Sequence, residues 1–146
     1  MKRIISTPNA PAAVGPYSQA VEVNNTLYIS GQLPINPATA TIEASDIAGQ
    51  TDQVFKNIIA ILQAAGYTLD DVVKNRVYLS DISNFAAMNE VYKQYFQSDF
   101  PARAAFAVKD LPMGALVEIE TVAVKWHYIN SLRLKPEADY IILRIY

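Results

Sequence analysis

Residues 100–120 predict two strands joined by a turn. Pro101 fixes its own φ angle and biases the residue before it toward an extended conformation. Residues 102–108 then form a strand of mostly small residues, in which Arg103 is the only large charged side chain. A proline and a glycine mark the turn that follows. We therefore expect a second strand over residues 115–125.

Two carboxylates lie on the second of these strands. Because side chains alternate between the two faces of a strand, Glu118 and Glu120 share one face with three apolar residues. A carboxylate in that setting lies at the end of a sheet, is paired, or is functional. A guanidinium such as that of Arg103 binds a small carboxylate through two parallel hydrogen bonds. On these residues alone, we favour an internal pair between Arg103 and a glutamate over catalysis.

The clearest helix is expected over residues 46–65, where the apolar residues follow helical spacing. Ser45 or Asp46 could cap its start, and Gly66 stands where a helix commonly ends.

A second helix is expected from a cap at Ser83 to about residue 96. Asn89 is polar on this helix, and simple exposure would be enough to explain it. Its large apolar side chains are assigned to the core rather than to a ligand site, and they are Phe85, Met88, Tyr92, Tyr95 and Phe96.

Further strands are expected before and between the helices. Tyr17 is placed at the start of one strand, and Gly31 interrupts another, which indicates a bulge or the close approach of another group. An ordinary aromatic at a strand end and a glycine needed for packing remain equally open for these two residues. In a later strand, Val73 is expected to share a face with its apolar neighbours. The expected strands cover residues 3–6, 17–23, 26–32 and 72–80, with a loop over 33–44.

The resulting order, β-β-β-α-β-α-β-β, predicts an α+β domain with both helices on one face of a mixed sheet. The other face of the sheet would still need a cover. The small side chains of Ala104, Ala105 and Ala107 would let another subunit approach closely. We therefore expect oligomerisation through that face.

Composition excludes several classes of function. The net charge of −2 argues against electrostatic binding of nucleic acid. Without cysteine, disulfides, thiolate catalysis and cysteine metal sites are excluded, and the single histidine, His127, cannot build a zinc site alone. No run approaches the roughly 18 apolar residues of a membrane span. We expect one domain in a soluble, cytoplasmic protein.

The remaining chemistry is narrow. A Ser-His-Asp triad fails because His127 lies in the last segment of the chain, and no phosphate-binding glycine motif is present. Arginine, glutamate, tyrosine and backbone amides remain. Such groups hold a small carboxylate and activate water, which suits a substrate that is already electrophilic. Residues 126–146 look like a separate piece, either a real extension that packs on an oligomer or non-native sequence.

Four separated motifs, in this order, resemble the reactive intermediate deaminase family, also called RidA or YjgF-like. The resemblance spans about residues 2–125, nearly all of the chain before its last segment. The motifs are Gly15-Pro16-Tyr17-Ser18-Gln19-Ala20, Ser30-Gly31-Gln32-Leu33-Pro34, Phe100-Pro101-Ala102-Arg103, and Leu111-Pro112 followed by Val117-Glu118-Ile119-Glu120.

The resemblance implies a chorismate-mutase-like α+β fold, a homotrimer with active sites between subunits, and no cofactor or metal. Family members hydrolyse reactive enamines and imines such as 2-aminoacrylate to 2-keto acids and ammonia. Carried onto this chain, Arg103 looks like the anchor for the substrate carboxylate. Glu118 looks like the residue that positions the attacking water, helped by the backbone carbonyl of Ala105. The positions that match the lining of the cleft are Tyr17, Ser30, Gly31 and Asn89.

The chain departs from the family in two places. Many members carry a cysteine where this sequence has Ala105, and residues 126–146 lie outside the resemblance. The alternative function is a binding or regulatory trimer that senses a 2-keto acid without turnover. A role in translation inhibition or RNA cleavage is disfavoured because the sequence has no histidine pair and no basic stripe.

Overall fold

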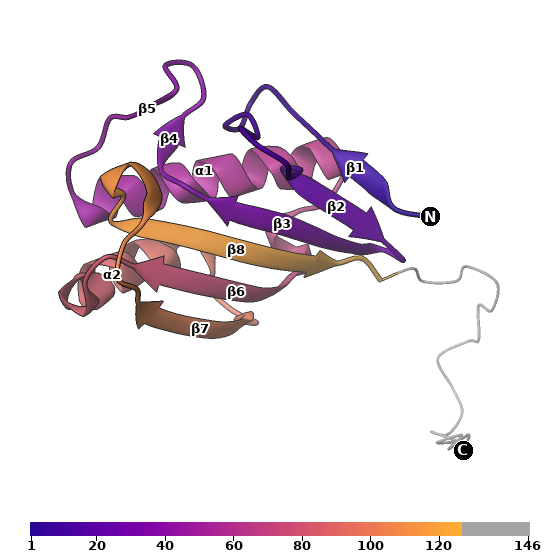
Figure 1. The fold of residues 1–146 in the computed structure, drawn as a ribbon. Coiled ribbons are helices and arrows are strands. Elements are labelled where there is room, and N and C mark those ends of the chain that lie inside the picture. Colours follow the sequence, from indigo (N-terminus) through magenta and orange to yellow (C-terminus); the bar gives the residue numbers. More distant parts are fainter. Residues whose placement is uncertain (127–146) are drawn as a thin grey trace, which may run out of the picture.

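The computed structural model describes residues 1–126 and contains one six-stranded sheet, a short hairpin and two helices (Figure 1). The strands of the sheet lie in the order β1-β2-β3-β8-β6-β7. All neighbours are antiparallel except β6 and β7, which makes the sheet mixed. The elements are β1 (Arg3–Ile5), β2 (Ala20–Val23), β3 (Thr26–Gln32), β4 (Ile35–Asn36), β5 (Thr41–Ile42), α1 (Ile47–Ala65), β6 (Val72–Leu79), α2 (Phe85–Tyr95), β7 (Ala102–Ala107) and β8 (Val117–Val124).

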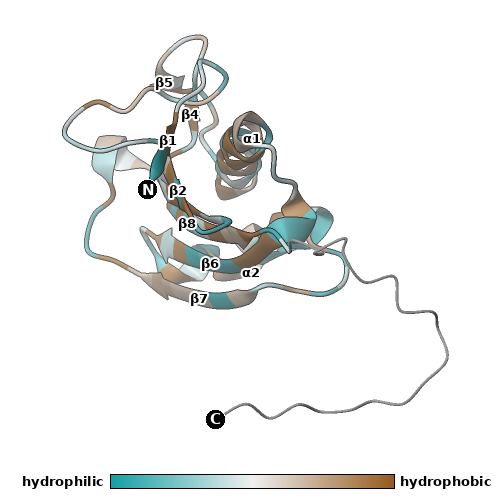
Figure 2. Cartoon of the chain, turned by 90° about the vertical axis from the view of Figure 1, so that its right-hand side faces the viewer, coloured by the Kyte–Doolittle hydropathy of each residue, from teal (hydrophilic) through white to brown (hydrophobic). Residues whose placement is uncertain are grey.

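Both helices cover the same face of the sheet, as predicted, and the α+β class is confirmed (Figures 1 and 2). The sequence of strand β8 explains why only one face is covered by helices. Its residues alternate between buried and half-buried along the whole strand. Val117 and Ile119 point to the helices and are fully buried. They pack with the buried face of α1, which includes Phe55 and Ile58. The hydrophobic core therefore lies between the helices and one face of the sheet.

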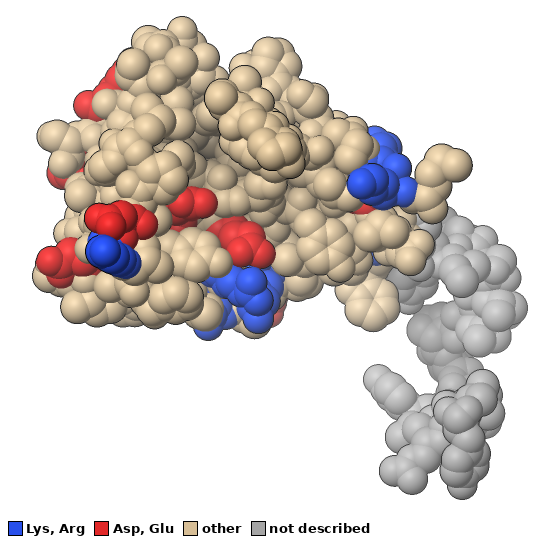
Figure 3. Space-filling model, viewed as in Figure 1, with Lys and Arg blue, Asp and Glu red and all other residues tan. Residues whose placement is uncertain are grey.

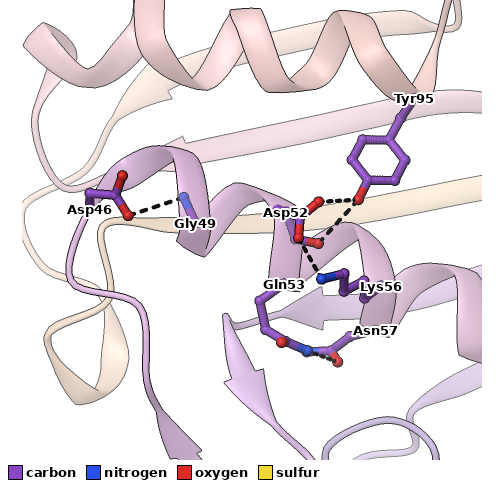
Figure 4. A network of polar contacts seen from close by, with 7 residues as sticks. All are labelled: Asp46, Gly49, Asp52, Gln53, Lys56, Asn57 and Tyr95. Atoms are coloured by element: carbon purple, nitrogen blue, oxygen red, sulfur yellow. Dashed lines mark hydrogen bonds and ion pairs between the residues drawn. The ribbon is translucent and has the colours of Figure 1, made fainter.

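Helix α1 begins and ends where its capping residues predict. The Asp46 side chain accepts a hydrogen bond from the amide of Gly49, and Gly66 ends the helix with φ of 81°. Asp52 links α1 to α2, because it accepts a hydrogen bond of 2.5 Å from the Tyr95 hydroxyl and pairs with Lys56 (Figure 4). Burial and the hydrogen bond to Asp52 raise the pKa of Tyr95.

Of three local predictions in the N-terminal half, two are wrong and one is confirmed. The strand expected from Tyr17 begins only at Ala20, because Gln19 holds the preceding loop through its buried side chain. The Gln19 amide donates to the carbonyls of Thr7 and Pro11 at 3.0 and 2.8 Å. The loop expected over residues 33–44 contains the hairpin of β4 and β5. The bulge at Gly31 is confirmed.

Two further predictions fail around β6 and α2. Val73 is exposed instead of sharing a buried face, because the pairing with β8 skips a residue between Val72 and Lys74. Ser83 does not cap α2. Its amide donates to the Asp81 side chain in the turn before the helix.

The second face of the sheet carries no helix within residues 1–126, and Figure 1 looks onto it. Tyr28 and Phe106 are about half exposed there, and Phe106 packs edge-on against Tyr78. Figure 3 shows basic and acidic side chains close together near the middle of this face, where Arg76 pairs with Glu120. We call this the open face. Neither helix in the described part is long and apolar enough to cross a membrane.

Candidate active site

Arg103 lies on β7, the edge strand, and points to the same side as the helices. In the parallel pairing of β6 and β7 it lies beside Asn75, which is fully buried under α2. Its Nη1 donates a hydrogen bond of 2.8 Å to the side-chain oxygen of Asn89. Its Cζ lies 4.6 Å from the centre of the Tyr92 ring and 5.6 Å from that of Phe85. The guanidinium therefore rests on α2, at the edge of the sheet.

A pocket of about 310 Å³ opens beside this guanidinium. Its residues are Asn89, Tyr92, Lys93, Phe100, Pro101 and Arg103. Ala105 follows on the same face of β7, where it is half buried against the core. Within residues 1–126, Asn89 provides the one side-chain hydrogen bond to Arg103, so part of the guanidinium is left for a ligand. We call Asn89, Arg103 and Ala105 the arginine group.

One prediction about these residues is wrong. Arg103 forms no ion pair with Glu118 or Glu120 in the described chain, because the two glutamates lie on the other face of the sheet. The structure favours the second reading of Asn89 over simple exposure, since its side chain orients the guanidinium.

Glu118 lies on β8 and points to the open face, beside the bulge in β3. The pairing of these strands passes from Ile29 and Thr121 to Gln32 and Ile119, so β3 carries one extra residue there. A Cβ atom placed on Gly31 would lie only 2.0 Å from Oε1 of Glu118. Of the two explanations offered for Gly31, a bulge or a close approach, the structure contains both.

Ser30 and Tyr17 lie next to this bulge. The Ser30 hydroxyl donates a hydrogen bond of 2.7 Å to the carbonyl of Ser18, which holds the loop before β2 against the end of β3. Tyr17 precedes Ser18 and is about half exposed. Its hydroxyl accepts from the Val14 amide at 3.4 Å. We call Tyr17, Ser30, Gly31 and Glu118 the glutamate group.

The environment of Glu118 disfavours its charged form. Burial raises the pKa of this carboxyl, and the negative charge of Glu120 raises it further. Glu120 itself accepts a hydrogen bond of 3.0 Å from Tyr78 and pairs with Arg76 at 3.5 Å. A pocket of about 330 Å³ adjoins both glutamates, and it is lined by Gly31, Tyr78, Val108, Asp110, Leu111, Pro112, Glu118 and Glu120.

The two groups do not meet within one chain. Glu118 lies across from Tyr78, which in turn lies beside Phe106 of β7, three residues further along than Arg103. Strand β6 separates their two strands, and their side chains point to opposite faces of the sheet. A substrate with a few heavy atoms cannot touch both in a single copy.

The sequence did not predict that three residues, Tyr92, Asn75 and Thr121, support Arg103. Tyr92 was assigned to the core by its helical spacing, which is correct but incomplete, since its ring also supports Arg103. Asn75 and Thr121 form a buried hydrogen-bonded chain to the Tyr92 hydroxyl. Their only sequence signal is a polar residue at a buried strand position. No group of three or more histidine, aspartate or glutamate side chains suited to a metal occurs in the described part of the chain.

Comparisons with known proteins agree on one family. The family model described as Endoribonuclease L-PSP matches residues 7–125. The 2-iminobutanoate/2-iminopropanoate deaminase of Capra hircus is 54% identical over 125 residues, which cover 86% of this chain and 91% of that protein.

Two solved structures have the same fold. The conserved Rid family protein YyfA of Yersinia pestis is 49% identical, with a TM-score of 0.84 over 86% of this chain and all of that one. TdcF of E. coli, solved with bound serine, is 40% identical, with a TM-score of 0.81 over 85% of this chain and 99% of that one. The chain therefore belongs to the Endoribonuclease L-PSP family, whose members include the reactive intermediate deaminases of the RidA and YjgF type.

Proposed function

We propose that this protein hydrolyses reactive enamines and imines, such as 2-aminoacrylate, to 2-keto acids and ammonia. The activity corresponds to that named for the goat relative, a 2-iminobutanoate/2-iminopropanoate deaminase. Each substrate carries one carboxylate, and its imine form, which an enamine reaches by taking up a proton from water on carbon, has one electrophilic C=N carbon. The arginine and glutamate groups offer one partner for each of these features.

In this reaction Arg103 binds the substrate carboxylate with the part of its guanidinium that Asn89 leaves free. Glu118 orients a water molecule and accepts a proton from it while the oxygen attacks the iminium carbon. The nitrogen of the resulting carbinolamine takes up a proton and leaves as ammonia, and the carbonyl of the 2-keto acid forms. The backbone carbonyl of Ala105 helps to hold the water. No cofactor takes part, since the carbon is already electrophilic.

The raised pKa of Glu118 suits a group that exchanges protons with water. Efficient proton transfer favours a pKa that lies near the working pH. The causes here are burial and the neighbouring Glu120, which Arg76 and Tyr78 hold in place. The same carboxyl, once protonated, could return its proton to the leaving nitrogen.

A complete site needs two copies of the chain. The observation that carries this proposal is the placement of Arg103 and Glu118 on opposite faces of one sheet. We propose a homotrimer of the chorismate-mutase-like type, in which the arginine group of one copy faces the glutamate group of its neighbour. The open face, with Tyr28 and Phe106 about half exposed, is the surface that the other copies would cover.

Subunit complementation tests this arrangement. Arg103→Ala and Glu118→Gln should each be inactive alone. In a ring of three, every mixed assembly contains one junction where an intact Arg103 meets an intact Glu118. Equal amounts, refolded together and shown to mix by native mass spectrometry, should recover about a quarter of the wild-type activity. Mixed assemblies without activity would exclude a site shared between copies.

The activity itself is tested by generating the imine with a threonine dehydratase. The release of 2-oxobutanoate and ammonia should exceed the uncatalysed rate in proportion to the protein added. A protein that binds 2-oxobutanoate but leaves this rate unchanged would be a keto-acid sensor, and the proposal would be wrong.

A further inference from the structure

The guanidinium of Arg103 lies on an aromatic ring that is more firmly fixed than the arginine itself. Arg103 is exposed on an edge strand, whereas Tyr92 is only 4% exposed. A cation over the face of an aromatic ring is attracted by the quadrupole of the ring. The Arg103 Cζ lies 4.6 Å from the ring centre, within the roughly 6 Å over which this attraction is significant. The buried Tyr92 ring therefore constrains the position of the exposed Arg103 guanidinium, and not the reverse.

A buried chain of hydrogen bonds holds the ring from the centre of the sheet. The side-chain amide of Asn75 donates to the Tyr92 hydroxyl oxygen at 2.9 Å. The Asn75 side-chain oxygen accepts from the Thr121 hydroxyl at 2.7 Å. Asn75 and Thr121 are at most 1% exposed and lie on the neighbouring strands β6 and β8. A buried polar chain with all its hydrogen bonds made resists rearrangement.

Aromatic neighbours fix the plane of the same ring. Phe55 of α1 meets Tyr92 edge-on at 5.6 Å between centroids, and Phe96 lies at 4.9 Å. Tyr92 is therefore held at its hydroxyl by the sheet and along its ring by the aromatic core. Its face toward Arg103 forms part of the wall of the pocket beside the guanidinium.

We propose that Tyr92 is a positioning residue, whose ring, held by Asn75 and Thr121, sets the plane of the Arg103 guanidinium for the substrate carboxylate. This inference rests on the role of Arg103 proposed above. A long side chain on an exposed edge strand loses conformational freedom when it binds a ligand. Because the Tyr92 ring already restricts the Arg103 side chain in the free protein, less conformational entropy is lost when the ligand binds. Carboxylate binding is therefore stronger. The step at Glu118 is untouched, so the effect falls on KM more than on kcat.

Two substitutions at Tyr92 separate positioning from stability. Tyr92→Phe keeps the ring but leaves the buried Asn75 amide without its partner, and Tyr92→Leu removes the ring as well. Both variants should melt at a lower temperature than the wild type. We expect Tyr92→Leu to raise KM about 5- to 30-fold, and Tyr92→Phe, whose ring Asn75 no longer holds, to raise KM by a smaller factor of about two to five. An equal rise in both variants, or an unchanged KM in Tyr92→Leu, would overturn the proposal.

A second measurement needs no turnover. With isotope-labelled arginine, the Arg103 Nε–H resonance is identified by its loss in Arg103→Ala, and it should carry the shift that a ring beneath it causes. We expect that shift in the wild type, a broadened signal in Tyr92→Phe, and the loss of the shift in Tyr92→Leu. If Tyr92→Leu does not fold, Thr121→Val, which breaks the far end of the chain, should broaden the signal. An unchanged resonance in the folded variant would overturn the positioning role, even for a protein that hydrolyses no imine.

Discussion

Replacement of Gly31 by alanine tests the placement of Glu118 with a single methyl group. The added Cβ would lie 2.0 Å from Oε1, 2.9 Å from Cδ and 3.2 Å from Cγ of Glu118. Gly31 is not among the residues with positive φ, so alanine fits its backbone conformation. The cost therefore falls on the Glu118 side chain and not on the strand.

The required displacement follows from these distances. Cβ atoms essentially never approach another heavy atom closer than 3.0 Å, so Oε1 must move by at least 1.0 Å from its 2.0 Å separation. A misplacement of about 1 Å in a catalytic geometry costs about 100-fold in rate. We expect Gly31→Ala to lower kcat/KM for imine hydrolysis by about 100-fold. The protein should stay folded, because a flexible carboxylate on the open face absorbs the clash.

Gly49→Ala is the matched control. Its Cβ would lie 2.8 Å from Oδ1 of Asp46, so the same methyl group meets a carboxylate at the start of α1 (Figure 4). We expect this variant to lose stability and to keep its activity per folded molecule. If Gly31→Ala keeps its activity within about threefold of the wild type, the rate does not depend on the position of the Glu118 carboxylate, and the reasoning is refuted.

Four further outcomes are expected. Arg103→Ala should weaken binding of 2-oxobutanoate, measured by titration calorimetry, roughly ten- to a hundredfold, with little change in melting temperature. Arg103→Lys should recover little of the lost affinity. Because folding raises the pKa of Glu118, the folded state binds its proton more tightly, and stability falls as pH rises from the unfolded value through the raised one. Glu118→Gln should therefore melt higher than the wild type at pH 7, with the difference vanishing below about pH 4. Dialysis against a strong chelator should leave imine hydrolysis intact, because the chain has no cysteine and one histidine; activity lost and then restored by a divalent ion would contradict this. A chain that ends at Lys125 should still fold, assemble and hydrolyse imine. A monomeric or insoluble product would show that residues 126–146 belong to the assembly; of these, residues 127–146 lie outside the described structure.

Local signals were enough to predict the helices and the strands that contact them. The helix of residues 47–65 follows from apolar spacing and from caps that act within a few residues. The bulge at Gly31 was also indicated, because glycine inside a strand is unfavourable without a reason. By contrast, Val73 was wrongly placed because the skipped residue before Lys74 depends on how β6 pairs with β8. Strand pairing is a long-range property that the alternation of side chains does not reveal.

The arrangement of the site was less accessible. The family motifs named Arg103 and Glu118 together, and the adjacent strands suggested an ion pair between them. Strand β6 inserts between β7 and β8, and the register of three strands then turns the two side chains to opposite faces. The support of Arg103 by Tyr92 was missed because a single residue serves both the core and the site.

Strand β7 joins the sheet through β6 alone, with its other edge unpaired in residues 1–126. Its residues are exposed or half-buried throughout, unlike those of β8. Such a strand can detach as a small cooperative unit while the rest of the sheet stays intact. Amide hydrogens of β7 should then exchange with deuterium faster than those of β8, by a route that does not pass through global unfolding. On warming, each chain would release Arg103, the proposed carboxylate anchor, before it loses its fold, so catalytic inactivation would precede melting.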